Sequence, residues 1–238
     1  MGSNARPDKT LGVAVIGLGV GEQHAHAFAA EPGCAVRWLI DQDIDKAAEV
    51  QGRVGCGSVG ASLDDVLGDD TVDIVSIATF DHMHAEQVIA SLQAGKHVFV
   101  EKPLCRTEAE LGNIIADWSA AGKPHLASNL VLREAELYCW LAAQIKAGAL
   151  GRVYAIDGDY LYGRLHKITE GWRGDVPNYS VIEGGGIHLI DLMIMLTGER
   201  PATVSCLGNR IGTEGTAFRY DDYMAASYTF PSGVIGRI

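Results

Sequence analysis

Short apolar runs alternate with amphipathic stretches through the first half of the chain. The apolar runs are rich in β-branched residues and bounded by Gly or Asp, which predicts strands. The intervening stretches carry the period of helices, with Thr107 and Asp81 at expected N-caps and Gly95 and Gly122 at expected C-caps. The predicted strands are residues 11–16, 36–40, 72–77 and 97–100, with 125–128 as a further candidate, and the helices are residues 22–30, 44–54, 84–94 and 108–121.

Strands and helices that alternate at this spacing form βαβ units with right-handed crossovers. The predicted fold class is therefore α/β, with a doubly wound parallel sheet of the Rossmann type over residues 1–128.

The regular alternation of strand and helix patterns ends after Asn129, and we expect an α+β domain over residues 129–238. Its expected elements are helices at 133–147 and 187–196 and strands at 152–162, 204–208, 223–230 and 234–238. The last strand follows a turn at Pro231-Ser232-Gly233 and runs to the final residue.

Charge and cysteine content narrow the class of protein. A net charge of −11 argues against nucleic acid as the main partner, because phosphate binding needs a basic face. The five cysteines are scattered without a C-x-x-C pair, which argues against a disulfide framework or zinc site. The polar N-terminus lacks a signal-peptide core, and no apolar run has the length of a membrane span. We expect a cytoplasmic protein without a membrane partner.

The segment Gly17-Leu18-Gly19-Val20-Gly21 follows the first strand and opens a helix. In dinucleotide folds the first Gly makes the tight turn, the second lets the backbone approach the pyrophosphate, and the helix N-terminus attracts its charge. Glu22 occupies the usual third Gly position, so the turn is expected to be one residue shorter, with Glu22 pointing away from the diphosphate. Gly17, Gly19, Val20 and Gly21 are the predicted cofactor contacts; the alternative is a Gly-rich turn without a ligand.

Asp41 closes the next predicted strand, twenty positions after Gly21. An acid at this position accepts hydrogen bonds from the adenosine ribose hydroxyls and repels a 2′-phosphate. Gln42 supplies no compensating cation, which predicts NAD(H) over NADP(H). Asp41 is also a candidate cap of the following helix, and the two roles are compatible.

Two further motifs, Thr79…His84 and Glu101-Lys102-Pro103, follow the next two predicted strands. With their mutual spacing the chain resembles the glucose–fructose oxidoreductase / inositol dehydrogenase / rhizopine-catabolism (Gfo/Idh/MocA) family. The resemblance extends to Asn129 and Arg133, to Gly148-Ala149-Leu150-Gly151-Arg152-Val153, and to Gly186-Ile187-His188-Leu189-Ile190-Asp191.

The resemblance implies a Rossmann domain followed by a domain with an open, mostly antiparallel sheet. One sheet face would serve assembly into a homodimer or homotetramer, and the substrate would be a sugar, polyol or nucleotide sugar. By this likeness Lys102 lies beside the nicotinamide and His188 is the general base, a task that suits imidazole with its ordinary pKa of about 6.5. Thr79, His84 and Glu101 would lie near the cofactor, and Asn129 and Asp191 near the substrate.

Plainer interpretations stay open for these residues. Lys102 is otherwise a solvated strand end, and His188 a histidine in an apolar core. The pairs His24/His26 and His82/His84 suggest a metal, but no cluster of carboxylates or cysteines completes a tetrahedral site, so we expect none.

The chain departs from the family pattern in three ways. Gly184 stands where many members carry an Asp, and either Asp175, Glu183 or no residue replaces it. Phe80 replaces a usual Pro. Family members are generally longer, so the chain is either a short variant or lacks a C-terminal portion.

A polar loop over residues 163–175 is a candidate wall of the substrate site. Arg164, Lys167 and Arg173 suit a carboxylate or the diphosphate of a nucleotide sugar. Trp172 and Tyr179 are candidates for stacking on a sugar or base; a solvated loop with one anchoring aromatic is the alternative.

The leading functional prediction is an NAD(H)-dependent oxidoreductase of CH–OH groups in a sugar, polyol or nucleotide sugar. One rival is a non-catalytic dinucleotide sensor on the same scaffold, since fold does not fix function. A second rival is a glycoside hydrolase that uses NAD to oxidise and re-reduce its sugar transiently.

Overall fold

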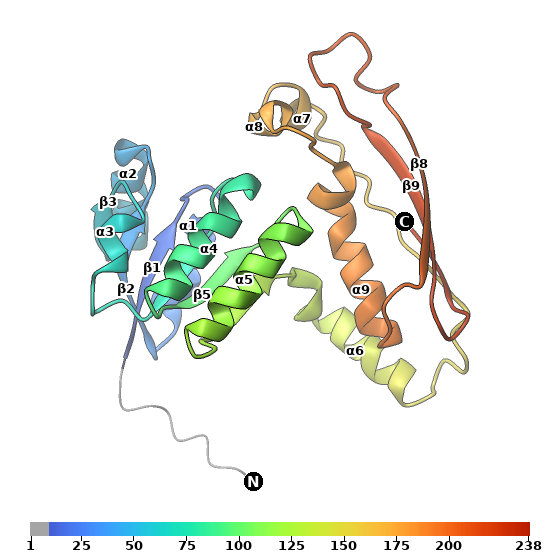
Figure 1. Cartoon of the computed structure of the whole chain (residues 1–238), viewed down its shortest axis with the longest axis horizontal. Helices are drawn as coiled ribbons and strands as arrows, with labels where there is room; N and C mark the ends of the chain where they lie inside the picture. Colours follow the sequence, from blue (N-terminus) through green and yellow to red (C-terminus); the bar gives the residue numbers. More distant parts are fainter. Residues whose placement is uncertain (1–9) are drawn as a thin grey trace. The chain divides into compact units, whose positions relative to one another are not determined.

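The computed structural model describes residues 10–238, which divide into two compact units (Figure 1). The first unit ends at Asn129 and the second is Leu130–Ile238. Each is an α/β arrangement around its own sheet.

The first unit holds a parallel sheet of six strands in the order β3-β2-β1-β4-β5-β6. The order reverses beside β1, so β1 and β4 flank the switch point at which open α/β sheets bind ligands. The strands are β1 (Leu11–Ile16), β2 (Cys34–Ile40), β3 (Ser58–Gly60), β4 (Ile74–Ile77), β5 (His97–Glu101) and β6 (Leu126–Asn129). The predicted doubly wound sheet is confirmed, and β3 is an additional edge strand.

Helices cover both faces of this sheet (Figure 1). They are α1 (Gly21–Ala30), α2 (Ile44–Val54), α3 (Asp64–Leu67), α4 (His84–Gln93) and α5 (Glu108–Ala120). Thr107 caps α5 through a capping box with Glu110, as its sequence position predicts. The expected cap at Asp81 is wrong, because Asp81 begins a 3₁₀ turn, Asp81–Met83, and α4 starts at His84.

The central strand β1 is buried on both faces, which explains its unbroken apolar run. Val13 and Val15 pack in one core cluster with residues of α1 and α2. Ala14 and Ile16 point to the other face and pack in the cluster that includes α4 and α5. The two-residue period of the strand therefore supplies both cores at once.

The second unit contains a mixed sheet of four strands in the order β7-β10-β9-β8. β10 is parallel to β7 and antiparallel to β9, and β8 is antiparallel to β9. The strands are β7 (Ala155–Asp157), β8 (Thr203–Asn209), β9 (Tyr223–Thr229) and β10 (Ile235–Arg237). The strand expected over 152–162 is thus confined to three residues, and residues 158–164 after it belong to no helix or strand.

The helices of the second unit are α6 (Glu136–Lys146), α7 (His166–Thr169), α8 (Trp172–Asp175) and α9 (Ile187–Thr197). Helix α9 covers one face of the sheet, where Met193 packs with Tyr228 and Phe230 of the β9 side. A π-helical turn, Ile182–Gly186, leads directly into α9.

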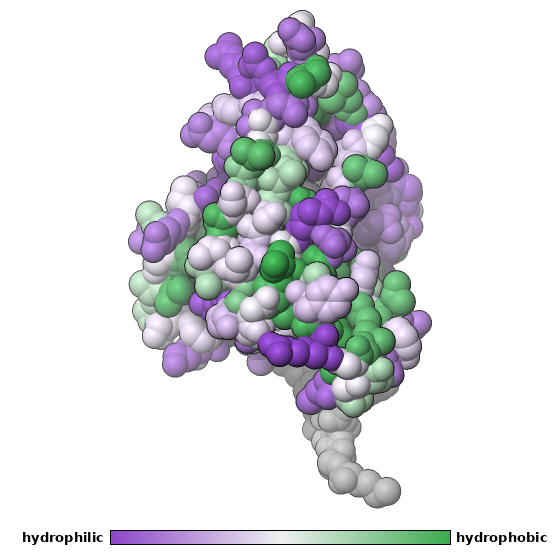
Figure 2. Space-filling view, turned by 90° about the vertical axis from the view of Figure 1, so that its right-hand side faces the viewer, coloured by the Kyte–Doolittle hydropathy of each residue, from purple (hydrophilic) through white to green (hydrophobic). Residues whose placement is uncertain are grey.

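The other sheet face is open. All seven residues of β8 are exposed, and Leu207, Tyr223 and Ile235 show more than half of their surface. Figure 2, seen from the side on which Figure 1 labels β8 and β9, shows apolar residues in green among polar ones. Among residues 10–238, no helix is long and apolar enough to cross a membrane.

Two adjacent isoleucines of α5 test the assigned core. Ile114 is 1% exposed and packs in the core beneath α5, whereas Ile115 is 54% exposed. We expect Ile114→Ala to lower the free energy of unfolding by about 2–5 kcal/mol, because it removes buried methyl groups and leaves a cavity. Ile115→Ala should change it by less than about 0.5 kcal/mol. Urea unfolding of both variants measures the difference, and equal destabilisation would contradict the orientation of α5.

Candidate cofactor site and active site

The glycines between β1 and α1 serve three different purposes. Gly17 has φ +83°, and a Cβ on it would lie 2.5 Å from the Ala78 carbonyl oxygen, so both the turn and the approach of β4 require Gly. A Cβ on Gly21 would lie only 3.2 Å from Ala78 Cβ and from Val15 Cγ1. Gly21 therefore allows α1 to pack on the sheet, the task of the third Gly in a longer loop.

Gly19 lies at the open surface of the same turn. A Cβ built on it would meet no atom of residues 10–238 within 4 Å. Together with the N-terminus of α1, which begins at Gly21, this leaves a backbone cradle suited to a diphosphate. The shortened turn expected from the sequence is confirmed, because α1 starts one residue earlier than predicted.

Glu22 is turned away from this cradle. Its carboxylate accepts hydrogen bonds from Arg53 Nε at 2.6 Å and Arg53 Nη2 at 3.1 Å. The pKa of Glu22 is lowered chiefly by this guanidinium. The negative charge that stands in the usual third Gly position is therefore paired with α2.

Asp41 follows β2 and ties the glycine loop to it. Its Oδ2 accepts from the backbone N–H of Leu18 at 2.8 Å and from Lys46 Nζ at 2.7 Å, and its Oδ1 accepts from the Asp43 N–H at 3.1 Å. Burial would raise the pKa of Asp41, but these hydrogen bonds lower it below its ordinary value. Asp43, not Asp41, caps α2, and Lys46 supplies the nearby cation that Gln42 does not.

Thr79 and His84 lie at the end of β4. Thr79 Oγ1 donates to Gln87 Oε1 at 2.6 Å. The fully buried His84 places Nδ1 2.7 Å from the Pro103 carbonyl oxygen and Nε2 3.3 Å from the Thr79 carbonyl oxygen. His84 thus braces the β4 exit against the segment that follows β5.

The Glu101 carboxylate connects β5 to α1 and β6. Its Oε1 lies 3.1 Å from His24 Nε2 and accepts from Asn129 Nδ2 at 2.6 Å, while Oε2 accepts from the Lys102 N–H at 3.3 Å. Burial would raise the pKa of Glu101, but hydrogen bonds from His24 and Asn129 bring it below its ordinary value. Asn129, predicted to bind substrate, donates to Glu101 in the structure. The peptide bond between Lys102 and Pro103 is cis.

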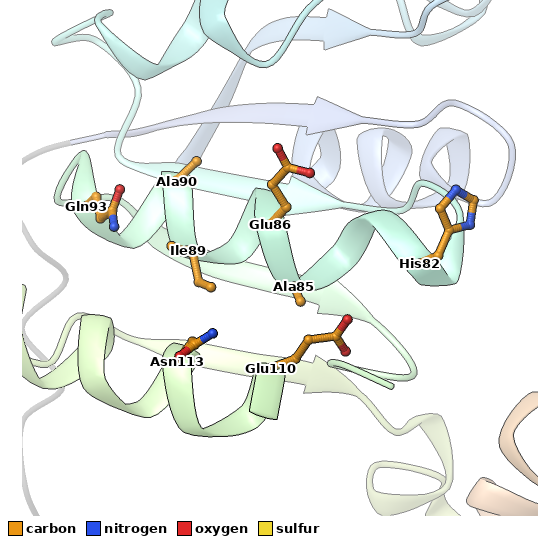
Figure 3. A pocket seen from close by; sticks show the side chains of 8 residues that line it. All are labelled: His82, Ala85, Glu86, Ile89, Ala90, Gln93, Glu110 and Asn113. Carbon is orange, nitrogen blue, oxygen red and sulfur yellow. The ribbon is translucent and has the colours of Figure 1, made fainter. Parts of the chain in front are cut away.

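A shallow groove of about 430 Å³ lies elsewhere on the first unit, between α4 and α5 (Figure 3). It is lined by His82, Ala85, Glu86, Ile89, Ala90, Gln93, Glu110 and Asn113. Within residues 10–238, no group of three or more His, Cys, Asp or Glu residues is arranged to hold a metal ion.

In the second unit, Asp191 and Arg133 form a forked ion pair. Arg133 Nε lies 2.8 Å from Asp191 Oδ2, and Nη2 lies 2.6 Å from Oδ1. Asp191 is predicted to bind substrate, and both of its carboxylate oxygens accept from the Arg133 guanidinium. The pair fixes α9 against the chain that enters the unit, and it raises the pKa of Arg133.

His188 lies in the first turn of α9, and its ring stacks on Tyr160 with centroids 6.2 Å apart. Tyr160 fits there because residue 185 is Gly: a Cβ would lie 2.6 Å from the Tyr160 ring. Gly184 is explained similarly, since the Tyr179 hydroxyl occupies the space that a Cβ would fill. Of the loop residues predicted to bind substrate, Arg164 lies 5.7 Å from the Tyr162 ring centre and Arg173 lies 4.4 Å from that of Trp172.

Comparison with known proteins gives the family. A model of an oxidoreductase family with an NAD-binding Rossmann fold (GFO_IDH_MocA) matches residues 11–126, and the GFO/IDH/MocA C-terminal domain matches residues 138–238. The chain belongs to the Gfo/Idh/MocA family. The resemblance drawn from Thr79…His84 and Glu101-Lys102-Pro103 is thereby confirmed.

Several similar proteins are named as oxidoreductases, and one is named as a hydratase. The chain is 30% identical to levoglucosan dehydrogenase from Pseudarthrobacter phenanthrenivorans, over 85% of this chain and 55% of that protein. It is 38% identical to 4-carboxy-2-hydroxymuconate-6-semialdehyde dehydrogenase from Sphingobium, over 87% of this chain and 75% of that protein. Several relatives are much longer: the chain spans 55% of the first of these and 59% of 1,5-anhydro-D-fructose reductase from Ensifer adhaerens.

Solved structures share the fold. Levoglucosan dehydrogenase in complex with NADH and levoglucosan superposes with a TM-score of 0.84 at 27% identity, over 95% of this chain and 65% of that one. Myo-inositol 2-dehydrogenase from Lactobacillus plantarum has a TM-score of 0.86 at 22% identity, over 96% and 69%, which supports the fold alone.

Four residues around these sites were not among the predicted contacts: Lys46, His24, Ser76 and Tyr160. Lys46 lies five positions after Asp41, and this spacing after an acid at a strand end is a usable signal. His24 binds Ser76 and Glu101, which are 52 and 77 positions away, and only the folded sheet brings them together.

Gly19→Ala tests the cofactor cradle. Because an added methyl group meets no described atom within 4 Å, the variant should fold with nearly unchanged stability. We expect NADH binding, measured by fluorescence titration, to weaken by about ten-fold or more, because the methyl group occupies the space of the diphosphate. Gly52→Ala, equally open in α2, is the control. Unchanged NADH affinity in Gly19→Ala would place the cofactor elsewhere.

Proposed function

We propose that the chain is an NAD(H)-dependent oxidoreductase that transfers a hydride between nicotinamide and a CH–OH carbon of a sugar, polyol or nucleotide sugar. The observation that carries this proposal is the arrangement at the carboxyl ends of β1, β2, β4 and β5. The glycine loop, Asp41, Thr79 and the Glu101-Lys102 segment follow these strands in turn, around the switch point of the sheet.

The first unit supplies the residues that would hold NAD(H). The open surface at Gly19 and the N-terminus of α1 suit the diphosphate, and Asp41 suits the adenosine ribose. Solved relatives named as complexes with NAD or NADH support the same cofactor. When bound, NAD⁺ supplies the acceptor for the hydride at nicotinamide C4.

In this proposal Lys102 and His188 handle the proton and the developing charge. Lys102 Nζ donates to the substrate hydroxyl oxygen and stabilises negative charge there as the hydride departs. A ring nitrogen of His188 accepts the hydroxyl proton, a general-base task matched to imidazole. Glu101 holds the backbone of Lys102, and Tyr160 holds the ring plane of His188.

The relatives favour catalysis over the two rivals. Several similar proteins are named as dehydrogenases or reductases, which supports net hydride transfer, and one is named as a hydratase. The 38%-identical relative is named for a carboxylated semialdehyde, so the candidate substrates extend from neutral sugars to carboxylic acids.

The surroundings of the enzyme are part of the proposal. The five free cysteines suit a reducing cytoplasm, and the open face of the second sheet suits a homodimer or homotetramer. Residues 1–128 would bind the cofactor, and residues 129–238 the substrate and the second subunit.

Lys102→Ala tests the chemistry. Wild-type protein with NAD⁺ should produce NADH absorbance with at least one member of a panel of inositols, aldoses, sugar acids and nucleotide sugars. The variant should lose about 10²-fold or more in kcat while still binding NADH, because the interaction it removes forms with the developing alkoxide. Lys123→Ala, an exposed lysine beside Trp118, is the control. NADH binding without turnover of any panel member would instead favour the sensor, and release of free sugar without absorbance change the hydrolase.

Asp41→Ser tests cofactor choice. Removing the carboxylate takes away the repulsion of a 2′-phosphate and leaves the Lys46 ammonium to attract it. The ratio of kcat/KM for NAD⁺ to that for NADP⁺ should fall by about ten-fold or more. Compared with the wild type, the double variant Asp41→Ser/Lys46→Ala should gain little affinity for NADP⁺, because the Lys46 ammonium is missing as well. Selectivity that stays the same in Asp41→Ser would rule out this role.

A further inference from the structure

A buried series of hydrogen bonds in the first unit links α1 to three strands of the sheet. The Ser76 hydroxyl oxygen of β4 lies 3.0 Å from His24 Nδ1 of α1, and His24 Nε2 lies 3.1 Å from Glu101 Oε1 of β5. The same Glu101 oxygen accepts from Asn129 Nδ2 of β6. His24 is only 7% exposed and Ser76 is fully buried, and the proposed chemistry uses neither side chain.

Glu101 determines which nitrogen of His24 carries the proton. Burial raises the pKa of Glu101, but its hydrogen bonds bring the pKa below the ordinary value, so the group is a carboxylate that only accepts. The imidazole proton therefore lies on Nε2 and is donated to Glu101. In the neutral ring Nδ1 is then an acceptor, and the Ser76 hydroxyl donates to it. With both ring nitrogens bonded, the orientation of His24 is fixed.

His24 lies in the helix that begins at the glycine loop. Helix α1 starts at Gly21, so His24 belongs to its first turn. A Cβ on Gly21 would lie 3.2 Å from Ala78 Cβ and from Val15 Cγ1, which shows that this turn lies directly against the sheet. A diphosphate bound by the N–H groups of the loop and helix start would stabilise the turn that carries His24.

The other end of the series reaches Lys102. Glu101 Oε2 accepts from the Lys102 N–H at 3.3 Å, so the position of the carboxylate holds the backbone from which the Lys102 side chain extends. A buried carboxylate that loses a donor seeks another, because an unsatisfied charge is costly. Loss of the His24 donor would therefore let Glu101 turn and release the Lys102 N–H.

We propose that His24 is a positioning residue that transmits occupation of the glycine loop to Lys102. A ligand on the loop stabilises the first turn of α1, His24 then holds Glu101, and Glu101 holds the Lys102 backbone. Cofactor binding and order at Lys102 are thus coupled, and the coupling is reciprocal. This inference rests on the proposed function, because it takes the glycine loop as the diphosphate site and Lys102 as a catalytic group.

The test uses ADP-ribose, the part of NAD that lacks nicotinamide. It would occupy the glycine loop without reaching Lys102, so any effect on Lys102 passes through the protein. Exchange of the Lys102 amide is followed by NMR with and without ADP-ribose at about one hundred times its Kd, which calorimetry supplies for each protein. The variants are His24→Asn, His24→Gln and Ser76→Ala. The matched control is His26→Asn, an exposed histidine of the same helix that lies 3.9 Å from Glu22.

In the wild type, ADP-ribose should slow exchange of the Lys102 amide by about five-fold or more, because openings that displace α1 must also release the ligand. His24→Asn should bind ADP-ribose and lose this effect, because its shorter amide reaches only the position of Nδ1. His24→Gln should keep the effect, since its amide reaches the position of Nε2 and donates to Glu101. Ser76→Ala and His26→Asn should both resemble the wild type.

Three results would overturn the inference: Lys102 exchange in the wild type that ADP-ribose does not change, an effect that survives in His24→Asn, or an effect that His24→Gln fails to restore. A second measurement needs no variant: ¹⁵N NMR of the wild-type His24 ring should find a proton on Nε2, and a ring without one would remove the link to Glu101.

Failure of the proposed function is recognised separately. NADH binding without turnover of any substrate in the panel would remove the dehydrogenase and leave the coupling through His24 intact. Absence of binding of both NADH and ADP-ribose would overturn the two together.

Discussion

The buried carboxylate of Glu101 is the group on which the candidate site of the first unit depends. It belongs to β5, yet it binds His24 of α1, Asn129 at the end of β6 and the N–H of Lys102. Hydrogen bonds outweigh burial and keep its pKa below the ordinary value, so it is an anion at neutral pH. Because α1 begins in the glycine loop, this carboxylate joins the cofactor cradle to Lys102.

Asp41 has the equivalent role after β2, three strands away from β5 in the sheet, where it holds the Leu18 N–H of the loop and the Lys46 ammonium. Asp41 holds the loop itself, and Glu101 holds the helix α1 that follows it. Each is stabilised as an anion by its own donors, and Glu22, the third acid of the region, is neutralised by Arg53. The surface offered to a diphosphate is therefore backbone, without an unpaired carboxylate of these three directed at it.

The sequence predicts most elements of the first unit, because short-range signals such as apolar runs, glycine spacing and helix caps determine where they begin and end. An apolar run predicts β1, and the spacing of the glycines predicts the loop after it. Thr107 and Glu110, three residues apart, predict the capping box at the start of α5. The sequence does not predict the short β3 and α3, because three or four residues are too few to show the hydrophobic periodicity of a strand or helix. The roles of His24 and Asn129 depend on contacts 77 and 28 positions away, which no local pattern contains.

The second unit was predicted less completely, for a related reason. Its pattern predicts a long strand over residues 152–162, but only Ala155–Asp157 pairs in the sheet, and the segment after β7 is polar and aromatic. The rest is held by rings that stack on one another and on His188. Gly184 is a departure from the family pattern, and the structure shows that tyrosine side chains occupy the space beside Gly184 and Gly185.

Hydrogen–deuterium exchange of the wild-type chain, with and without NADH, tests the central claim most directly. The account predicts that NADH slows exchange in residues 17–22 and 101–104, while the groove between α4 and α5 and the edge around α3 stay unchanged. Slower exchange confined to that groove, or no change anywhere in the chain, would contradict a cofactor site built at the strand ends by Asp41 and Glu101.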